Sequence, residues 1–251
     1  MLKHVSEFVN ENGVLIITVS STCGLLSEIC RRLMVIKIDE ISRERERGAR
    51  YNLNRRLSLA CKIFSPHLKA LNANSRSVKD WCLDSIFNPW LGDYNFTISK
   101  AINAIGKDFN IYHTASPSFF LDDSWYKKSQ KKDINKLAVN QFYQKLLGFL
   151  DYRVNFDSIG ERETDKNFRE LEFLCNCIFK LHNNFLKKKN YSKLSDLIKM
   201  LQEIKKILPY EMSLTKLAIN DYVISLPKFI DNYKIVKFNY FKNGGAEDKI
   251  I

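Results

Sequence analysis

The chain has 251 residues, of which 45% are hydrophobic and 12% aromatic, and it carries a formal net charge of +12. A chain of this length can bury a sizeable core, and its hydrophobic content excludes the composition of a disordered protein. The positive charge indicates an anionic partner, either nucleic acid or an acidic protein.

The first half of the chain begins with a short apolar run and continues with helical patterns. Residues 14–19 read VLIITV, which is a strand signal and is too short to span a bilayer. Apolar residues at three- and four-residue spacing then predict helices over 22–47 and 53–71. Ser75 or Ser77 and Thr97 can cap two shorter helices, which the pattern predicts over 78–87 and 98–109.

The second half has stronger helical periodicity. Its apolar positions predict helices over 134–149, 167–188 and 194–208, and another from about 214 that ends before Pro227. Residues 229–241 suit a helix or an edge strand. These elements predict an all-α, bundle-like fold, to which residues 14–19 can add one short N-terminal strand, with an α+β fold as the alternative.

A change of charge and period predicts how the chain is divided. We expect an arginine-rich helical part over 1–110, an irregular connection over 111–132, a helical bundle part over 133–242 and a flexible tail over 243–251. A single continuous domain is the alternative reading of the same pattern.

Arginines are concentrated in one stretch of the sequence. Eight of the 12 lie between Arg31 and Arg56, and residues 43–56 read RERERGARYNLNRR. Glu44 and Glu46 neutralise part of this run, so a solvated, self-paired helix surface explains it as well as a binding surface does. The candidate nucleic-acid contacts in the run are Arg43, Arg47, Arg50, Tyr51, Asn54, Arg55 and Arg56, because guanidinium, amide and aromatic groups together can hold phosphate and stack on a base.

Lysines form a second candidate patch at Lys187, Lys188 and Lys189. They follow a predicted helix, and cations at a helix C-terminus also stabilise the helix dipole. That structural role is sufficient to explain them, so this patch is the weaker of the two candidates.

The six cysteines match neither a disulfide framework nor a metal site. Cys175, Cys177 and His182 resemble a zinc-ligand set, but residues two apart on a helix point in nearly opposite directions. Cys23, Cys30 and Cys175 are predicted to be core positions, and no metal or other cofactor is expected. With no secretory signal, the chain is predicted to be cytoplasmic.

Two enzymatic alternatives depend on other residues. A nuclease that holds Mg²⁺ needs carboxylates that converge on one site, and the candidates are Asp151, Asp157, Glu161, Glu163, Asp165, Glu170 and Glu172. A hydrolase could use His113 with Ser116 or Ser118, although no nucleophile motif surrounds them. No nucleotide-binding glycine motif occurs, and we identify no catalytic residue.

The sequence therefore favours a non-catalytic, basic, helical accessory subunit that binds DNA or RNA or joins a complex that handles nucleic acid. A metal-dependent nuclease and an adaptor for an acidic protein are the alternatives. Bacterial antiviral defence or a mobile element would suit such a protein, but no residue argues for that setting. The sequence predicts no membrane partner and leaves the oligomeric state open.

Overall fold

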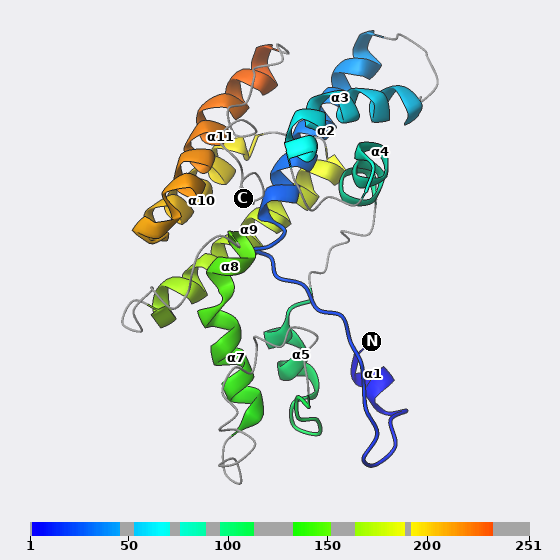
Figure 1. Cartoon of the computed structure of the whole chain (residues 1–251), viewed down its shortest axis with the longest axis vertical. Coiled ribbons are helices and arrows are strands. Elements are labelled where there is room, and N and C mark those ends of the chain that lie inside the picture. Colours follow the sequence, from blue (N-terminus) through cyan, green and yellow to red (C-terminus); the bar gives the residue numbers. More distant parts are fainter. Residues whose placement is uncertain are drawn as a thin grey trace.

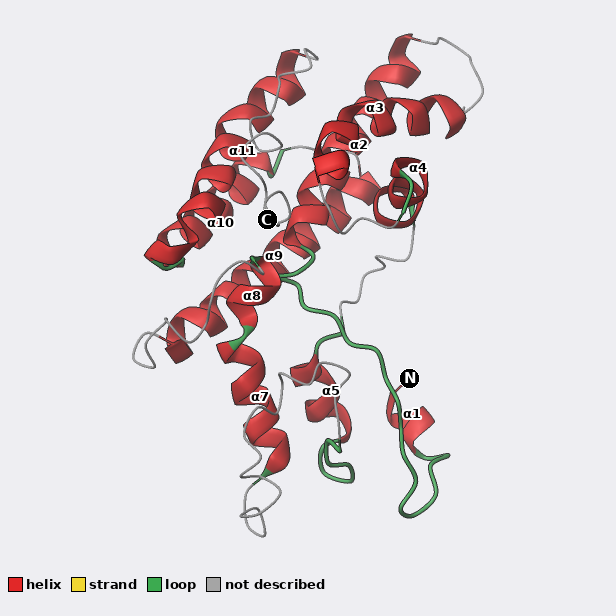
Figure 2. Cartoon of the chain, in the orientation of Figure 1, coloured by secondary structure: helices red, strands yellow, loops and turns green. Residues whose placement is uncertain are grey.

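The computed structural model describes residues 2–45, 53–70, 76–88, 96–112, 133–151, 164–188 and 192–232. Every regular element within these ranges is a helix, as Figure 2 shows, and none of the described residues forms a strand. The all-α prediction is confirmed. Three predicted segments lie wholly or mostly outside the described residues: the connection over 111–132 from residue 113, the strip over 229–241 from residue 233, and the tail over 243–251.

The N-terminal helices follow the predicted pattern closely. They are α1 (Leu2–Ser6), α2 (Leu26–Arg45), α3 (Leu53–Ala70), α4 (Val78–Trp81), the π-helix η1 (Cys82–Phe87) and α5 (Ile98–Ile105). Ser77 and Thr97 cap α4 and α5, because their hydroxyls accept hydrogen bonds from the backbone N–H groups of Asp80 and Lys100. Periodicity and capping residues therefore located these elements correctly, while α1 was not predicted.

The C-terminal helices differ from the prediction at two points. They are α7 (Ile134–Gln144), α8 (Leu146–Leu150), α9 (Thr164–Lys188), α10 (Leu194–Ile207), the 3₁₀ turn η5 (Tyr210–Met212) and α11 (Ser213–Asn232). The helix predicted over 134–149 is divided at Lys145, whose φ of −93° and ψ of 1° are not helical. The helix predicted to end before Pro227 instead continues through it to Asn232.

The continuation of α11 past Pro227 has a tertiary cause. Proline lacks the N–H that would bond the preceding turn, and in a helix interior this costs roughly 3 kcal/mol. Tyr222 and Leu226, only 1% and 0% exposed, anchor this part of the helix in the core. Their burial favours the helical path despite the missing hydrogen bond.

Residues 14–19 form a loop rather than a strand (Figure 2). Val14 and Ile16 are 70% and 89% exposed, and the Ser20 N–H that follows donates to the carbonyl oxygen of Phe96 at 2.9 Å. A strand needs a neighbouring strand to pair with, and none exists among the described residues. High β-propensity alone did not produce the predicted N-terminal strand.

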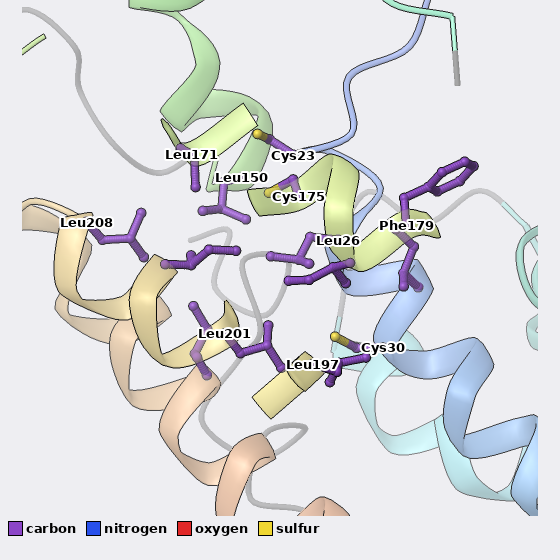
Figure 3. Packing of buried hydrophobic residues seen from close by; sticks show 14 of the residues in the cluster. Cys23, Leu26, Cys30, Leu150, Leu171, Cys175, Phe179, Leu197, Leu201 and Leu208 are labelled. Carbon is purple, nitrogen blue, oxygen red and sulfur yellow. The ribbon is translucent and has the colours of Figure 1, made fainter. Parts of the chain in front are cut away.

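Helix α9 is the centre of the packing. It contacts α2, α7, α8 and α10, while α10 also contacts α11 (Figure 1). The larger hydrophobic cluster joins buried residues of α2 to those of α8, α9 and α10, several of which are drawn in Figure 3. A smaller cluster joins α2 to α3 and η1. Buried residues from both sides of the predicted 111–132 connection, such as Cys30 and Cys175, share the larger cluster.

The buried cysteines belong to this core. Cys23, Cys30 and Cys175 are at most 5% exposed, which confirms their prediction as core positions (Figure 3). A hydrogen bond with Cys23, together with burial, raises the pKa of the Cys175 thiol well above its usual value. Burial likewise raises the pKa of Cys30 to about 12. The Cys30 and Cys175 thiols are therefore protonated at neutral pH and pack as small hydrophobic groups.

Candidate nucleic-acid interface

The structure describes the side chains of three of the predicted contact residues, Asn54, Arg55 and Arg56. Arg43 lies in α2, and Lys187 and Lys188 lie in α9, but their side chains are outside the described part of the structure. Four further predicted residues lie wholly outside the described ranges: Arg47, Arg50, Tyr51 and Lys189.

The three described residues belong to the first turns of α3 and are not equivalent. Asn54 and Arg55 are exposed. Arg56 is half-buried, and its guanidinium lies 5.4 Å from the centre of the Phe87 ring at the end of η1. Stacking on an aromatic ring holds Arg56 against the protein. Asn54 and Arg55 are therefore the two of these residues that face the solvent.

Helix α3 carries further cations on the side away from the core. Its buried residues are Leu57, Ala60, Phe64 and Leu68, and its exposed basic residues are Arg55, Lys62 and Lys69. These three are seven residues apart, which is nearly two helical turns, so they lie on one face over a length of about 21 Å. We call Arg55, Lys62 and Lys69 the α3 cationic face.

The α3 sequence contains no acidic residue. Its 18 residues read LNRRLSLACKIFSPHLKA, with two arginines and two lysines and neither Asp nor Glu. No residue of the cationic face can therefore form an ion pair within α3, whereas Glu44 and Glu46 can pair with arginines of the 43–56 run. The sequence analysis did not identify Lys62 and Lys69. Their seven-residue spacing from Arg55 on a predicted helix would have indicated that the three residues share one face.

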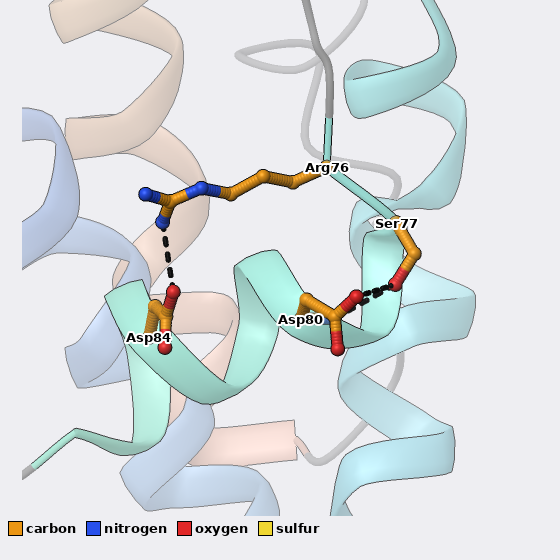
Figure 4. Close-up of polar contacts among 4 residues, drawn as sticks. All are labelled: Arg76, Ser77, Asp80 and Asp84. Atoms are coloured by element: carbon orange, nitrogen blue, oxygen red, sulfur yellow. Dashed lines mark hydrogen bonds and ion pairs between the residues drawn. The ribbon is translucent and has the colours of Figure 1, made fainter.

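Two acidic residues of the neighbouring α4–η1 segment accept hydrogen bonds from the two residues that precede α4. Arg76 donates to Asp84 at 2.8 Å, and the Ser77 hydroxyl donates to Asp80 at 2.6 Å (Figure 4). The Arg76–Asp84 pair is 59% exposed on both sides, so its contribution to stability is small. It nevertheless offsets one negative charge next to α3, which contacts α4.

Two arginines of the predicted basic concentration are structural and do not belong to the surface. Arg31 and Arg32 are only 1% and 5% exposed. The Arg31 guanidinium lies 5.4 Å from the centre of the Trp81 ring, and Arg32 donates to the backbone carbonyl oxygens of Ser85 and Asn88. Fewer of the arginines over 31–56 are therefore accessible to a partner than the sequence suggests, because the number of arginines in a stretch does not show which of them are buried.

The acidic residues considered for a nuclease are placed apart where the structure describes them. Asp151 accepts a hydrogen bond from the Thr215 hydroxyl, and Glu172 accepts one from the Tyr143 hydroxyl at 2.8 Å. Burial and the neighbouring Glu172 raise the pKa of Tyr143 to about 12. Glu170 is exposed on α9. Among the described residues, no three His, Cys, Asp or Glu side chains are grouped so that they could hold a metal ion.

The remaining candidate catalytic residues cannot be placed. Asp157, Glu161, Glu163, His113, Ser116 and Ser118 lie outside the described residues, as does the Asp165 side chain. Asp151 and Glu172 bond separately to Thr215 and Tyr143, whereas Glu170 is exposed on α9. The α3 cationic face is therefore the best-defined candidate site.

None of the described helices is long and apolar enough to cross a membrane. Comparison with known protein families, with curated proteins and with solved structures finds no match for this chain. The case for function therefore depends on the geometry of this chain alone.

Proposed function

We propose that the chain is a basic helical accessory subunit that binds the phosphate backbone of nucleic acid through the α3 cationic face. The observation that carries this proposal is the alignment of Arg55, Lys62 and Lys69 on one exposed face of a helix without acidic residues.

The chemistry of this face suits a phosphate polymer. Lysine and arginine contact phosphate oxygens without reading base sequence, and each contact releases condensed counterions. The exposed amide of Asn54 in the first turn of α3 adds a neutral donor next to Arg55. A face about 21 Å long extends past several phosphates of one strand. Binding of this type is independent of base sequence and strongly dependent on salt.

The salt dependence of binding tests the proposal. On a duplex, each phosphate contact contributes about −0.9 to the slope of log affinity against log salt. Three contacts therefore correspond to a slope of about −2.7 and a roughly 40-fold loss of affinity between 50 and 200 mM salt. We expect Arg55→Ala, Lys62→Ala and Lys69→Ala each to make the slope on duplex DNA shallower by about 0.9, the contribution of one phosphate contact. Fluorescence anisotropy with labelled duplex DNA, single-stranded DNA and RNA measures the affinity at each salt concentration.

A matched control keeps the same change of net charge. Lys180, Lys193 and Lys199 are exposed lysines on or next to α9 and α10. Replacing these three by alanine should leave most of the slope intact, while the triple α3 variant should lose nearly all of it. Equal losses in both triple variants would mean that general charge governs binding and would contradict the α3 assignment.

Two further outcomes would contradict the proposal itself. Failure of all three nucleic acids to bind at low salt, combined with capture of an acidic protein that survives nuclease treatment, would assign the face to a protein partner. Metal-dependent cleavage of the labelled nucleic acid, abolished by EDTA, would show that the chain is an enzyme.

A further inference from the structure

Helix α11 has two apolar faces, of which only one packs against the rest of the chain. The buried face carries Thr215, Ala218, Ile219, Tyr222 and Leu226, all at most 6% exposed. The Tyr222 hydroxyl on this face donates to the carbonyl oxygen of Cys30 in α2 at 3.0 Å. This face holds α11 against α10 and the core.

The second apolar face points to the solvent. Leu214, Leu217 and Ile224 are 39%, 45% and 52% exposed, and Tyr210 just before the helix is 86% exposed. Their spacing of three, four and seven residues places them on one line, which we call the α11 stripe. In Figure 1, α11 runs along the edge of the molecule beside α10. Large apolar side chains aligned on an exposed helix are typical of an interaction surface.

Opposite charges stand at the two ends of the α11 stripe. Glu211, next to Tyr210, and Lys228, four residues beyond Ile224, are both exposed. Lys228 belongs to the same line of the helix because α11 continues through Pro227. The stripe therefore has Glu211 at its N-terminal end and Lys228 at its C-terminal end, with the aliphatic side chains and Asp221 between them.

This order of charges makes the stripe complementary to itself in an antiparallel arrangement. We infer that two copies of the chain pair through α11 in antiparallel orientation, about a two-fold axis at the level of Ile219. Leu214 of one copy then meets Ile224 of the other, and Lys228 meets Tyr210 and Glu211. Parallel pairing would instead place Lys228 beside Lys228 and Glu211 beside Glu211.

Asp221 limits the strength of this pairing. It lies on the stripe between Leu217 and Ile224 and is half-buried already in the single chain. In the antiparallel pair it comes opposite Leu217 of the second copy, where the loss of water around its carboxylate opposes the pairing. A single helix face with one such interruption is a small interface, so we expect a weak dimer with a dissociation constant in the micromolar range.

Analytical ultracentrifugation of the full chain without nucleic acid tests this inference. Protein concentrations of about 1–200 µM bracket the expected dissociation constant. We expect a shift from monomer to dimer with rising concentration. Leu217→Glu should remain monomeric throughout, while Asp221→Asn should lower the dissociation constant because it removes the charge from the stripe. Phe173→Glu, which changes an apolar residue of α9 that is 65% exposed, should behave as the wild type.

Charge exchange tests the antiparallel orientation. Glu211→Lys and Lys228→Glu should each weaken the dimer about threefold to tenfold, and the double variant should restore it. All of these side chains are half-buried or exposed, so circular dichroism and urea unfolding should confirm that each variant remains folded. A monomer at every concentration would overturn the inference, as would a dimer that Leu217→Glu leaves intact. A double variant as weak as the single variants would overturn the antiparallel arrangement.

Discussion

Arg32 is a charged side chain that the fold removes almost entirely from water. Its Nε donates to the carbonyl oxygen of Ser85 at 2.8 Å and its Nη1 donates to that of Asn88 at 2.9 Å. Burial lowers the pKa of Arg32, and the nearby Glu28 opposes that shift. The planar fork of guanidinium allows one side chain of α2 to satisfy two carbonyl groups at the end of η1.

Replacement of Arg32 by alanine should destabilise the fold by about 3 kcal/mol, because two partly buried carbonyl groups lose their donor and the buried guanidinium leaves a space in the packing. Arg32→Lys should lose part of this amount, since an ammonium cannot reproduce the fork. Urea unfolding measures both, and Arg55→Ala, which removes an exposed guanidinium, is the control that should change stability little. Similar midpoints for Arg32→Ala and Arg55→Ala would show that the Arg32 contacts contribute little.

A single side-chain amide, that of Asn135, joins the chain after α5 to the start of α7. The Asn135 side chain accepts a hydrogen bond from the Ile111 N–H at 3.0 Å. It also donates to the carbonyl oxygens of Gly106 at 3.2 Å and Phe109 at 2.8 Å. Asn135 is 6% exposed, so these three bonds set the course of the chain after α5 without a regular element.

Asn135→Ala should therefore cost about 2–3 kcal/mol of unfolding free energy, because three partly buried backbone groups lose their partner. Asn135→Asp should also destabilise the fold, since a carboxylate keeps the acceptor and loses both donors. Hydrogen exchange at the Ile111 amide should accelerate in Asn135→Ala. Asn103→Ala, at an exposed position of α5, is the matched control, and equal effects of the two alanine variants would refute this role for Asn135.

Helices α2 and α9 meet in the core and bring His182 close to Arg32. His182 is 0% exposed, and burial lowers its pKa from 6.5 to about 4. The neighbouring Asn183 side chain opposes this shift, whereas the charge of Arg32 adds to it. The imidazole is thus neutral at pH 7 and belongs to the packing between the two helices.

This buried imidazole makes the stability of the fold dependent on pH. Between pH 6.5 and about 4, the unfolded chain binds a proton at His182 and the folded chain does not. The contribution of the neutral His182 to the free energy of unfolding is therefore fully present above pH 6.5 and is lost as the pH falls toward 4. The loss reaches about 3 kcal/mol near pH 4. Urea unfolding at a series of pH values should show that His182→Leu lacks this component, whereas His4→Ala, at an exposed histidine, retains it.

Local patterns in the sequence were sufficient for most of the helices. The positions of α3, α9 and α10 follow from apolar spacing, and Ser77 and Thr97 follow from the capping chemistry of their hydroxyls. The α3 cationic face could have been predicted in the same way, because a helix that buries Phe64 and Leu68 turns Lys62 and Lys69 toward the solvent. Asn54 and Arg55 were identified from the sequence, whereas the two lysines were missed.

The period of the α-helix was enough to predict that the chain is helical and which stripe of most helices turns inward. The tertiary structure was needed to decide which arginines of the 31–56 stretch reach the solvent. Arg32 and Arg55 belong to the same arginine-rich stretch, yet one is bonded inside the core by η1 and the other faces water. It also decided that α11 passes Pro227 and that residues 14–19 form no strand, since both depend on contacts with distant segments.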